Sequence, residues 1–443
     1  MSSRGCWVLF CFFSLLHFSE SYDPIDPNGD IEIKWDFQEL RDDGGYTVLV
    51  NVYNNQLYRH VEKPGWALSW TWPSDEVIWD MRGAEATKQG NCSRFRGDNL
   101  PHSCEKNPVI VDLLPGAPYK MQTQNCCRGG VLSSMIQDGD RYMSSFQMSV
   151  GGEMKDGGPL RAKPFNFGFG VAGYTCSNVT VVPPTKFMTP NTRHQKQALM
   201  TWQVTCSYSQ FRESLKPTCC VSLSTFYNDT IVSCPRCSCG CQGPPSTSQC
   251  ARDGRLPDFL QLPHDDDNEP SDPVVMCTQH MCPIRVHWHL KTNYKEYWRV
   301  KVTITNFNLV KNYSDWNLVI QHPNLKSLVQ VFSFNYKPLI EYGNINDTGM
   351  FWGIKYYNEM LLQEGEFGNV QSEMLLHKDP GSFTFQGGWG FPRSVLFNGH
   401  ECVMPPPDTY PSLPRGSNAV SISGFRVSFG LLSLFVFSVW ILL

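Results

Sequence analysis

Apolar and polar residues alternate along several segments of this chain, and this period-two pattern limits the fold to one built on β-sheets. In residues 46–53, Tyr46, Val48, Val50 and Val52 fall on one face. In residues 284–291 the apolar set alternates with polar residues, namely Ile284, Val286, Trp288 and Leu290 against Arg285, His287, His289 and Lys291. Aromatic residues make up 13% of the chain, which also favours strands. The pattern predicts an all-β protein with half-buried antiparallel sheets.

Two parts of the chain carry the same features in the same order. The first copy contains Val48, Val50, Val52, Asn54, Trp66, Leu68 and Pro73. The second contains Val300, Val302, Ile304, Asn306, Trp316, Leu318 and Pro323. Each copy closes on phenylalanines followed by a cysteine and a proline, Phe165, Phe167, Cys176 and Pro183 in one and Phe383, Phe385, Cys402 and Pro405 in the other. Chance matching of common strand residues is the alternative, but the shared order predicts two related β-sandwich domains.

The N-terminus has the pattern of a secretory signal. Arg4 precedes an apolar stretch over residues 6–18, and the small residues Ser19 and Ser21 then match what a signal peptidase reads. An N-terminal membrane anchor is the alternative, but the apolar run is shorter than a membrane span requires. We therefore predict cleavage after Ser21.

The C-terminus has the pattern of a glycosylphosphatidylinositol (GPI) attachment signal. A cluster of small residues at 416–419 is followed by a polar spacer and then by an uncharged run over residues 427–443. The predicted attachment residue is Asn418, with Ser417 and Gly416 as alternatives. An ordinary membrane helix is the other interpretation, although no Lys or Arg follows the run as an anchor.

These features divide the chain into six predicted parts. They are the signal peptide (1–21), the first sandwich (22–200), a Cys-rich segment with an acidic linker (201–275), the second sandwich (276–404), a Pro-rich stalk (405–418) and the removed GPI signal (419–443). The acidic run at 264–273 lacks the ligand spacing and the glycine of a calcium loop, so a solvated linker is expected there.

The cysteine count fits an oxidising compartment. The chain has 18 cysteines, and removing Cys6 and Cys11 with the signal leaves an even number, 16. The cluster at 234–241 contains four cysteines, for which disulfides are expected and a thiophilic metal is the alternative. The adjacent pairs 126–127 and 219–220 are each expected to bridge to separate partners, because a ring between neighbours is strained.

Five acceptor sequences for N-glycosylation support the extracellular interpretation. Their asparagines are Asn91, Asn178, Asn228, Asn312 and Asn346. Used acceptors mark exposed loops of a secreted protein.

Charge and motifs narrow the function classes. The formal net charge of −4 gives no reason to expect a nucleic-acid partner. The glycine pattern at 168–173 is followed by a strand-like run, so we interpret it as a turn and not as a dinucleotide site. His287 and His289 share a strand face, yet no third metal ligand is evident beside them. Glu359 and Glu364 fit a glycosidase pair only if they face each other in space.

Tryptophans near residue 70 admit two interpretations. Trp66, Leu68, Trp70 and Trp72 share one strand face, which favours the core of a sandwich. Flat aromatic rings also stack on sugars, so Trp70 and Trp72 remain candidates for a carbohydrate platform. Trp79, beyond the turn at 73–75, is the stronger surface candidate.

Several long strings resemble the plant COBRA family of GPI-anchored cell-wall proteins. They lie at residues 219–222, 277–289, 293–300, 368–372 and 402–407, and the resemblance extends from about Tyr22 to the end. The resemblance implies a non-catalytic protein of the outer plasma-membrane face and cell wall that binds cellulose, a β-1,4-glucan. It implies effects on microfibril deposition or crystallisation, and hence on oriented expansion and wall strength, with membrane attachment through the GPI lipid.

The resemblance also bears on single residues. The N-terminal region of the family is similar to family-2 carbohydrate-binding modules, and residues 65–73 carry that likeness here. Where those modules have one surface tryptophan, this chain has Arg82, so only Trp79 is carried over. No catalytic residue, cofactor or metal is implied. A wall glycan hydrolase or transglycosylase, and a disulfide-rich protein-binding module, are the alternative functions.

Overall fold

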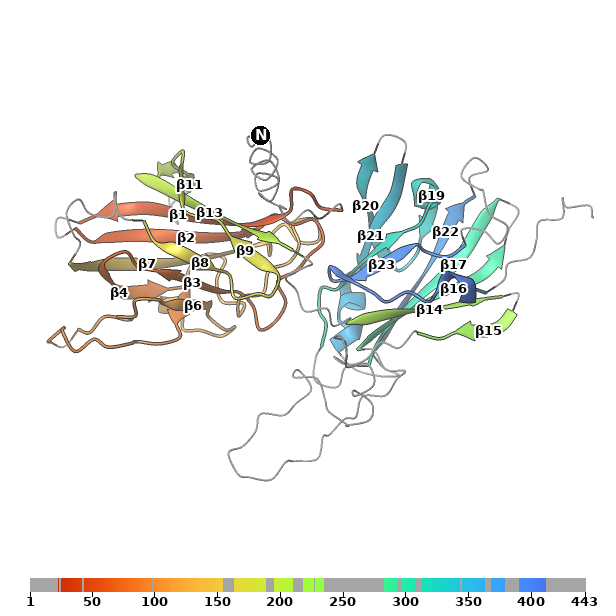
Figure 1. The fold of residues 1–443 in the computed structure, drawn as a ribbon, viewed down its shortest axis with the longest axis horizontal. Coiled ribbons are helices and arrows are strands. Elements are labelled where there is room, and N and C mark those ends of the chain that lie inside the picture. The colour runs from red at the N-terminus through yellow and green to blue at the C-terminus, as the bar shows by residue number, and fades with distance from the viewer. Residues whose placement is uncertain are drawn as a thin grey trace, which may run out of the picture.

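The chain folds into two β-sandwiches with a few short 3₁₀ helices. The computed structural model describes residues 23, 25–41, 44–97, 99–153, 163–188, 195–209, 218–226, 228–234, 283–293, 296–307, 312–342, 345–362, 368–378 and 390–411. The predicted all-β class with two sandwich domains is confirmed (Figure 1). The predicted signal peptide, the GPI signal and most of the Cys-rich segment lie outside the described residues.

The first sandwich contains two sheets and a short hairpin. Its larger sheet, the β2 sheet, has the order β10 (Thr180–Val182), β13 (Met200–Tyr208), β1 (Asp30–Leu40), β2 (Tyr46–Asn54), β7 (Met143–Glu153) and β4 (Asp75–Arg82), with β9 (Tyr174–Cys176) also on β13. The facing β3 sheet has the order β5 (Ala84–Ala86), β6 (Val109–Asp112), β3 (Ala67–Thr71) and β8 (Phe165–Gly168). The hairpin pairs β11 (Lys186–Met188) with β12 (Gln195–Gln197).

Tryptophans dominate the core between these sheets. Trp35, Trp66, Trp70, Trp72 and Trp202 are each 1% exposed. The rings of Trp35, Trp70 and Trp72 meet edge to face, with the centroids of Trp35 and Trp70 5.0 Å apart. This geometry is favoured between aromatic rings and adds to the free energy of burying them. The prediction that the alternating residues at 66–72 form a sandwich core is confirmed.

The second sandwich repeats this architecture. Its β17 sheet has the order β15 (Asn228–Val232), β14 (Cys219–Thr225), β16 (Ile284–Asn293), β17 (Tyr297–Asn306), β22 (Asn369–His377) and β19 (Leu328–Val331). Its β18 sheet has the order β20 (Phe334–Tyr342), β21 (Ile345–Gly353), β18 (Asn317–Gln321), β23 (Ser394–Phe397) and β24 (His400–Glu401). The short helices within the described residues are η1 (Tyr119–Met121), η4 (Leu325–Ser327), η5 (Lys355–Asn358), η6 (Met360–Leu362) and η8 (Pro407–Thr409).

Strand order confirms the internal repeat. The series β1-β2-β7-β4 in one sandwich corresponds to β16-β17-β22-β19 in the other, and β5-β6-β3-β8 corresponds to β20-β21-β18-β23. The strand beside β1 or β16 differs, because β13 is antiparallel to β1 whereas β14 is parallel to β16. The two copies therefore fill the same sheet position with a strand from opposite ends of the domain.

The observed sandwiches extend beyond the predicted boundaries. β13 continues the first sandwich through Tyr208, past the predicted end at residue 200. β14 and β15, placed by the sequence in the Cys-rich segment, belong to the β17 sheet. β14 is buried along its whole length, and its pairing with β16 on one side and β15 on the other removes two sheet edges.

Five disulfides connect described cysteines. They are Cys92–Cys104, Cys126–Cys127, Cys176–Cys206, Cys219–Cys402 and Cys220–Cys234. Cys219 and Cys220 bridge to separate partners, as predicted, and Cys234 is bonded to Cys220.

The prediction for the pair at 126–127 was wrong, because these neighbours bond to each other. The backbone there is held in an unusual shape. Cys127 has a φ of 71°, and the Asp112 carboxylate accepts the N–H groups of Cys127, Arg128 and Gly130 at 2.8–2.9 Å. The ring between neighbours is therefore supported from outside by a buried anion.

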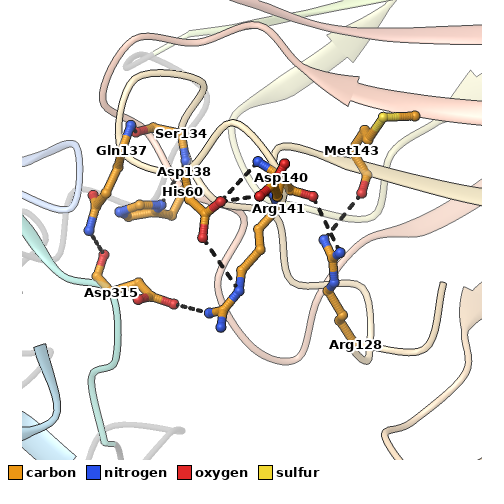
Figure 2. Close-up of polar contacts among 9 residues, drawn as sticks. All are labelled: His60, Arg128, Ser134, Gln137, Asp138, Asp140, Arg141, Met143 and Asp315. Atoms are coloured by element: carbon orange, nitrogen blue, oxygen red, sulfur yellow. Dashed lines mark hydrogen bonds and ion pairs between the residues drawn. The ribbon is translucent and has the colours of Figure 1, made fainter. Parts of the chain in front are cut away.

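A mixed interface connects the two sandwiches. Its apolar part is the cluster Ile25, Tyr58, Val319, Met350 and Leu396. In its polar part, Gln137 donates to the carbonyl of Asp315 at 2.6 Å, and the guanidinium of Arg141 donates to the Asp315 carboxylate at 2.7 Å (Figure 2). His60 is half-buried beside them, and its Nδ1 accepts the N–H of Ser134 at 3.0 Å (Figure 2). Burial lowers the pKa of His60, which keeps the ring neutral.

No helix among the described residues is long and apolar enough to cross a membrane.

Candidate glycan-binding face

The exposed side of the β2 sheet carries a polar strip with aromatic rings at both ends. We call it the outer face. Its residues alternate with the core residues of the same strands, and they are Glu32, Lys34, Asp36, Gln38, Thr47, Leu49, Asn51, Tyr53, Trp79, Ser145, Gln147 and Ser149. Asp36, Asn51 and Ser145 are buried among their neighbours, and the others are half-buried. The alternation follows from the strand pleat, which sends successive side chains to opposite faces.

Trp79 marks one end of the outer face. It sits at a β-bulge, where the register between β4 and β7 shifts from Ile78 to Asp80. Its indole lies over Gly151, since a Cβ on that glycine would be 2.8 Å from the indole nitrogen. The ring of Phe95 meets it edge to face at 5.1 Å. The bulge therefore turns Trp79 outward, where it is half-buried and fixed by packing.

Hydroxyl and amide groups fill the middle of the outer face. Gln147 donates to Gln38 at 2.7 Å, and the hydroxyl of Ser145 donates to Asn51 at 2.7 Å. Asn51 in turn donates to the Asp36 carboxylate at 3.0 Å. These bonds fix the side chains before any ligand arrives, so less conformational entropy is lost on binding.

Asp36 is a structural anchor of this strip. Its second oxygen accepts the hydroxyl of Thr201 at 2.7 Å, and the residue is 1% exposed. Both carboxylate oxygens are thus occupied by neighbouring side chains.

Tyr53 and Tyr142 mark the other end. Their rings are 6.2 Å apart, and the ammonium of Lys34 lies 5.6 Å from the centre of the Tyr53 ring. Burial, with the nearby charge of Asp36, raises the pKa of Tyr53 to about 12. The phenol therefore remains a hydrogen-bond donor at any physiological pH.

The outer face is long. Tyr53 pairs with Met143, and Trp79 lies over Gly151, eight residues further along β7. At about 3.4 Å per residue the two aromatic ends are about 27 Å apart. Arg82, opposite Gln147 in the register, adds an exposed cation to the same face near Trp79.

Of the predicted platform tryptophans, the structure places only Trp79 on this surface. Trp70 and Trp72 are 1% exposed and pack against Trp35, so assigning them to a carbohydrate platform was wrong. Their faces are covered by other core rings. Tyr53 and the polar strip were missed, although the residues between the apolar positions of 46–53 carried the signal.

The other predicted sites are dispersed. Glu359 follows η5, while Glu364 lies outside the described residues. His287 and His289 lie side by side on the second sandwich, and the described residues contain no group of three or more His, Cys, Asp or Glu side chains placed to bind a metal ion. The glycine pattern ends β8 and leads into β9, as a turn.

The glycosylation acceptors fall in different settings. Asn91, Asn178 and Asn312 are exposed in loops. Asn346 is half-buried in β21, and Asn228 is the first residue of β15.

Comparison of the sequence with known proteins assigns the chain to a family. Residues 46–209 match the COBRA N-terminal domain and residues 218–411 match the COBRA family C-terminal domain. This chain belongs to the COBRA family. The two matched ranges correspond to the two sandwiches, with the break between β13 and β14.

Individual COBRA relatives align along nearly the whole chain. COBRA-like protein 7 of Oryza sativa subsp. japonica is 58% identical over 97% of this chain and 98% of its own. COBRA-like protein 6 of Arabidopsis thaliana is 59% identical over 90% and 87%, and Protein COBRA of the same plant is 52% identical over 96% and 93%. None of these names describes an enzyme.

Proposed function

We propose that this COBRA protein is a non-catalytic cell-surface protein that binds an extended β-1,4-glucan along its outer face. The observation that carries the proposal is the outward side of the β2 sheet, where half-buried polar groups lie between Trp79 and Tyr53 and are fixed by buried ones such as Asn51 and Ser145. Aromatic rings offer flat apolar area to sugar rings, and the amides and hydroxyls between them match sugar hydroxyls. A surface about 27 Å long suits a polymer more than a small sugar.

The chemistry of the outer face supports holding a glucan, not cleaving it. A glycosidase uses two carboxyl groups that flank the scissile bond and exchange protons with it. Asp36, the buried carboxylate beneath the polar strip, has both oxygens bound by Asn51 and Thr201. It thus orders the strip and, at 1% exposure, is withdrawn from a bound sugar.

We further propose attachment to the outer plasma-membrane face through a GPI lipid on Asn418, Ser417 or Gly416. The described part of the stalk leaves the second sandwich at Cys402 and turns through η8. A stiff Pro-rich spacer at this position would hold the sandwiches away from the lipid. A tethered glucan-binding protein at that distance would bias how emerging chains align into microfibrils in the wall.

A cellulose-binding assay tests the proposal. The full chain, purified in mild detergent, is incubated with crystalline and amorphous cellulose, and bound protein and released sugar are both measured. We expect binding without sugar release, and at least tenfold weaker binding by Trp79→Ala. Tyr119→Ala is the matched control, because Tyr119 is 91% exposed on η1 outside the outer face.

Each contrary result selects another function. Released sugar would support the hydrolase or transglycosylase alternative. Absence of binding to both forms of cellulose would overturn glucan binding and favour a protein partner. Unchanged binding by a folded Trp79→Ala variant would place the glucan elsewhere on the molecule.

A further inference from the structure

The outward side of the β17 sheet is basic, although the whole chain is acidic with a formal charge of −4. We call it the basic face. Its charged residues on β16, β17 and β22 are Arg285, Lys291, Arg299, Lys301 and Glu373. Glu373 is the sole carboxylate that these three strands present outward, and it already binds Lys291 and Arg299 at 2.5 Å each. Positive charge therefore remains in excess on this face.

Two of these cations form no ion pair in the described part of the chain, although Glu373 is the register partner of Lys301. Lys301 forms no ion pair within the described part of the chain. Arg285 lies with its guanidinium 4.8 Å from the centre of the Phe307 ring and likewise forms no ion pair there. Burial is the largest cause of the lowered pKa values of His287 and His289. The positive charges of Arg285, Lys291 and Lys301 lower these pKa values further.

A hydrogen-bonded row of serines and histidines crosses the same face. The hydroxyl of Ser222 lies 2.7 Å from Nδ1 of His287, and Nε2 of that ring lies 2.8 Å from the hydroxyl of Ser224. Ser224 is in turn 2.7 Å from Nδ1 of His289. The two imidazoles are held nearly parallel, with 16° between their planes.

The donors and acceptors along this row can be assigned from one end. Ser222 is 3% exposed, and its hydroxyl hydrogen has no described acceptor apart from His287. Ser222 therefore donates to Nδ1 of His287, whose Nε2–H donates to Ser224, which donates to Nδ1 of His289. Both imidazoles are neutral in this arrangement, in agreement with their lowered pKa values. Nε2–H of His289 is the donor left over at the end of the row.

The remaining N–H donor, on Nε2 of His289, lies near basic side chains. His289 pairs with Lys301 in the sheet register, and it is half-buried, so its ring edge reaches solvent. A fixed N–H beside an ammonium group binds a carboxylate oxygen more strongly than a neutral oxygen. From Arg285 to Lys291 the basic groups extend along six residues of β16, or about 20 Å, which suits a linear polyanion.

We propose that the basic face binds an acidic polysaccharide built of uronate sugars, with carboxylates at Lys301 and His289. The choice of a wall polysaccharide as the source of the carboxylates rests on the extracellular location in the proposed function. The two sandwiches then hold two polymers at once, a neutral glucan on the first and a uronate chain on the second. The contacts around Asp315 connect the two sandwiches that carry these faces.

Binding of polygalacturonate to the full chain in mild detergent tests this proposal. We expect binding that weakens with added salt, and no binding of the fully methyl-esterified polymer, which has lost its charges. Lys301→Gln and His289→Ala are each expected to bind roughly tenfold more weakly, the effect of losing a charged hydrogen bond. Lys337→Gln, an exposed lysine on β20 of the opposite sheet, is the matched control and keeps full binding.

Other outcomes overturn the proposal. It fails if polygalacturonate does not bind, if the esterified polymer binds equally well, or if Lys301→Gln and His289→Ala bind as the unaltered protein does. Equal competition by poly-glutamate would show a merely cationic surface and would also overturn it. The same preparations are assayed on cellulose, so that failure of glucan binding is seen separately from failure of uronate binding.

Discussion

Asn54 and Asn306 occupy the same position in the two sandwiches, and the side chain of each donates to backbone carbonyls that lie outside the strands. Each is the last residue of a central strand, and each is 0% exposed. The side-chain amide of Asn54 donates to the carbonyls of Arg59 and Ser133 at 2.8 and 2.9 Å, and that of Asn306 donates to Leu361 at 3.2 Å. The repeated asparagine thus closes the loop where the chain leaves the sheet.

Replacing these asparagines is expected to destabilise the protein. Asn54→Ala leaves two buried carbonyls without their donor, and an unsatisfied buried group costs about 1–3 kcal/mol. We expect a loss of about 2–4 kcal/mol in the free energy of unfolding, measured by urea denaturation, and a smaller loss for Asn306→Ala. Asn55→Ala, at the half-buried neighbouring position, is the control and should cost less than about 1 kcal/mol. Equal losses at positions 54 and 55 would contradict this account.

The interface between the sandwiches should depend more on Asn317 than on the ion pair beside it. Asn317 is 0% exposed and donates to the carbonyl of Tyr58 at 2.7 Å, whereas the side chain of Arg141 is 53% exposed. Exposed ion pairs contribute about 0–1 kcal/mol, and a buried unsatisfied carbonyl costs more. Asn317→Ala should therefore accelerate proteolysis between the sandwiches, while Arg141→Ala changes it little. The reverse order would show that the ion pair holds the interface.

The sequence predicted those parts of the fold that depend on local pattern. Alternation located β2 and β16, and the repeated residues predicted two related sandwiches, which the shared strand order confirms. The pairing of β13 with β1 was missed. Residues 200–208 alternate well, but nothing in their own sequence indicates which sheet they join. The bond between Cys126 and Cys127 was missed for a similar reason. It depends on Asp112, a distant residue that holds the turn.

The candidate site was only partly predictable. Residue type alone does not distinguish Trp70 and Trp72 from Trp79, because all three are tryptophans. Alternation placed Trp70 and Trp72 on one face of their strand. A bulge at Ile78 and Asp80 then decides which way Trp79 points, and a bulge depends on the partner strand. Tyr53 lies on an unambiguous strand, so its outward position followed from the pattern although its proposed contact with a sugar did not.

Asp26 should make stability depend on pH. Burial raises its pKa from an ordinary value of 3.8 to about 6, so the folded state favours the protonated carboxyl. Its contribution is fully present below about pH 4 and is lost as the pH rises through 6. Asp26→Asn is therefore expected to be more stable than the unaltered protein at pH 7, by up to about 3 kcal/mol, and equally stable near pH 4.

Urea denaturation at several pH values between 4 and 7 measures this difference. Asp408→Asn is the control, because Asp408 is exposed in η8 and should show no such trend. A stability difference for Asp26→Asn that stays constant across the range would contradict the assignment to a single buried carboxyl.

The disulfides should contribute very unequally to stability. Cys219 and Cys402 are 183 residues apart and join the two ends of the second sandwich, so their bond removes much of the freedom of the unfolded chain. In the chain-entropy model a loop of this length corresponds to about 5 kcal/mol. Cys126 and Cys127 are adjacent, so their bond closes almost no loop. Replacing both cysteines of the first pair by alanine should therefore lower the urea midpoint far more than the same change at 126 and 127. Equal effects would mean that the ring at 126–127 holds the turn on Asp112 and that contacts in the folded state outweigh chain entropy.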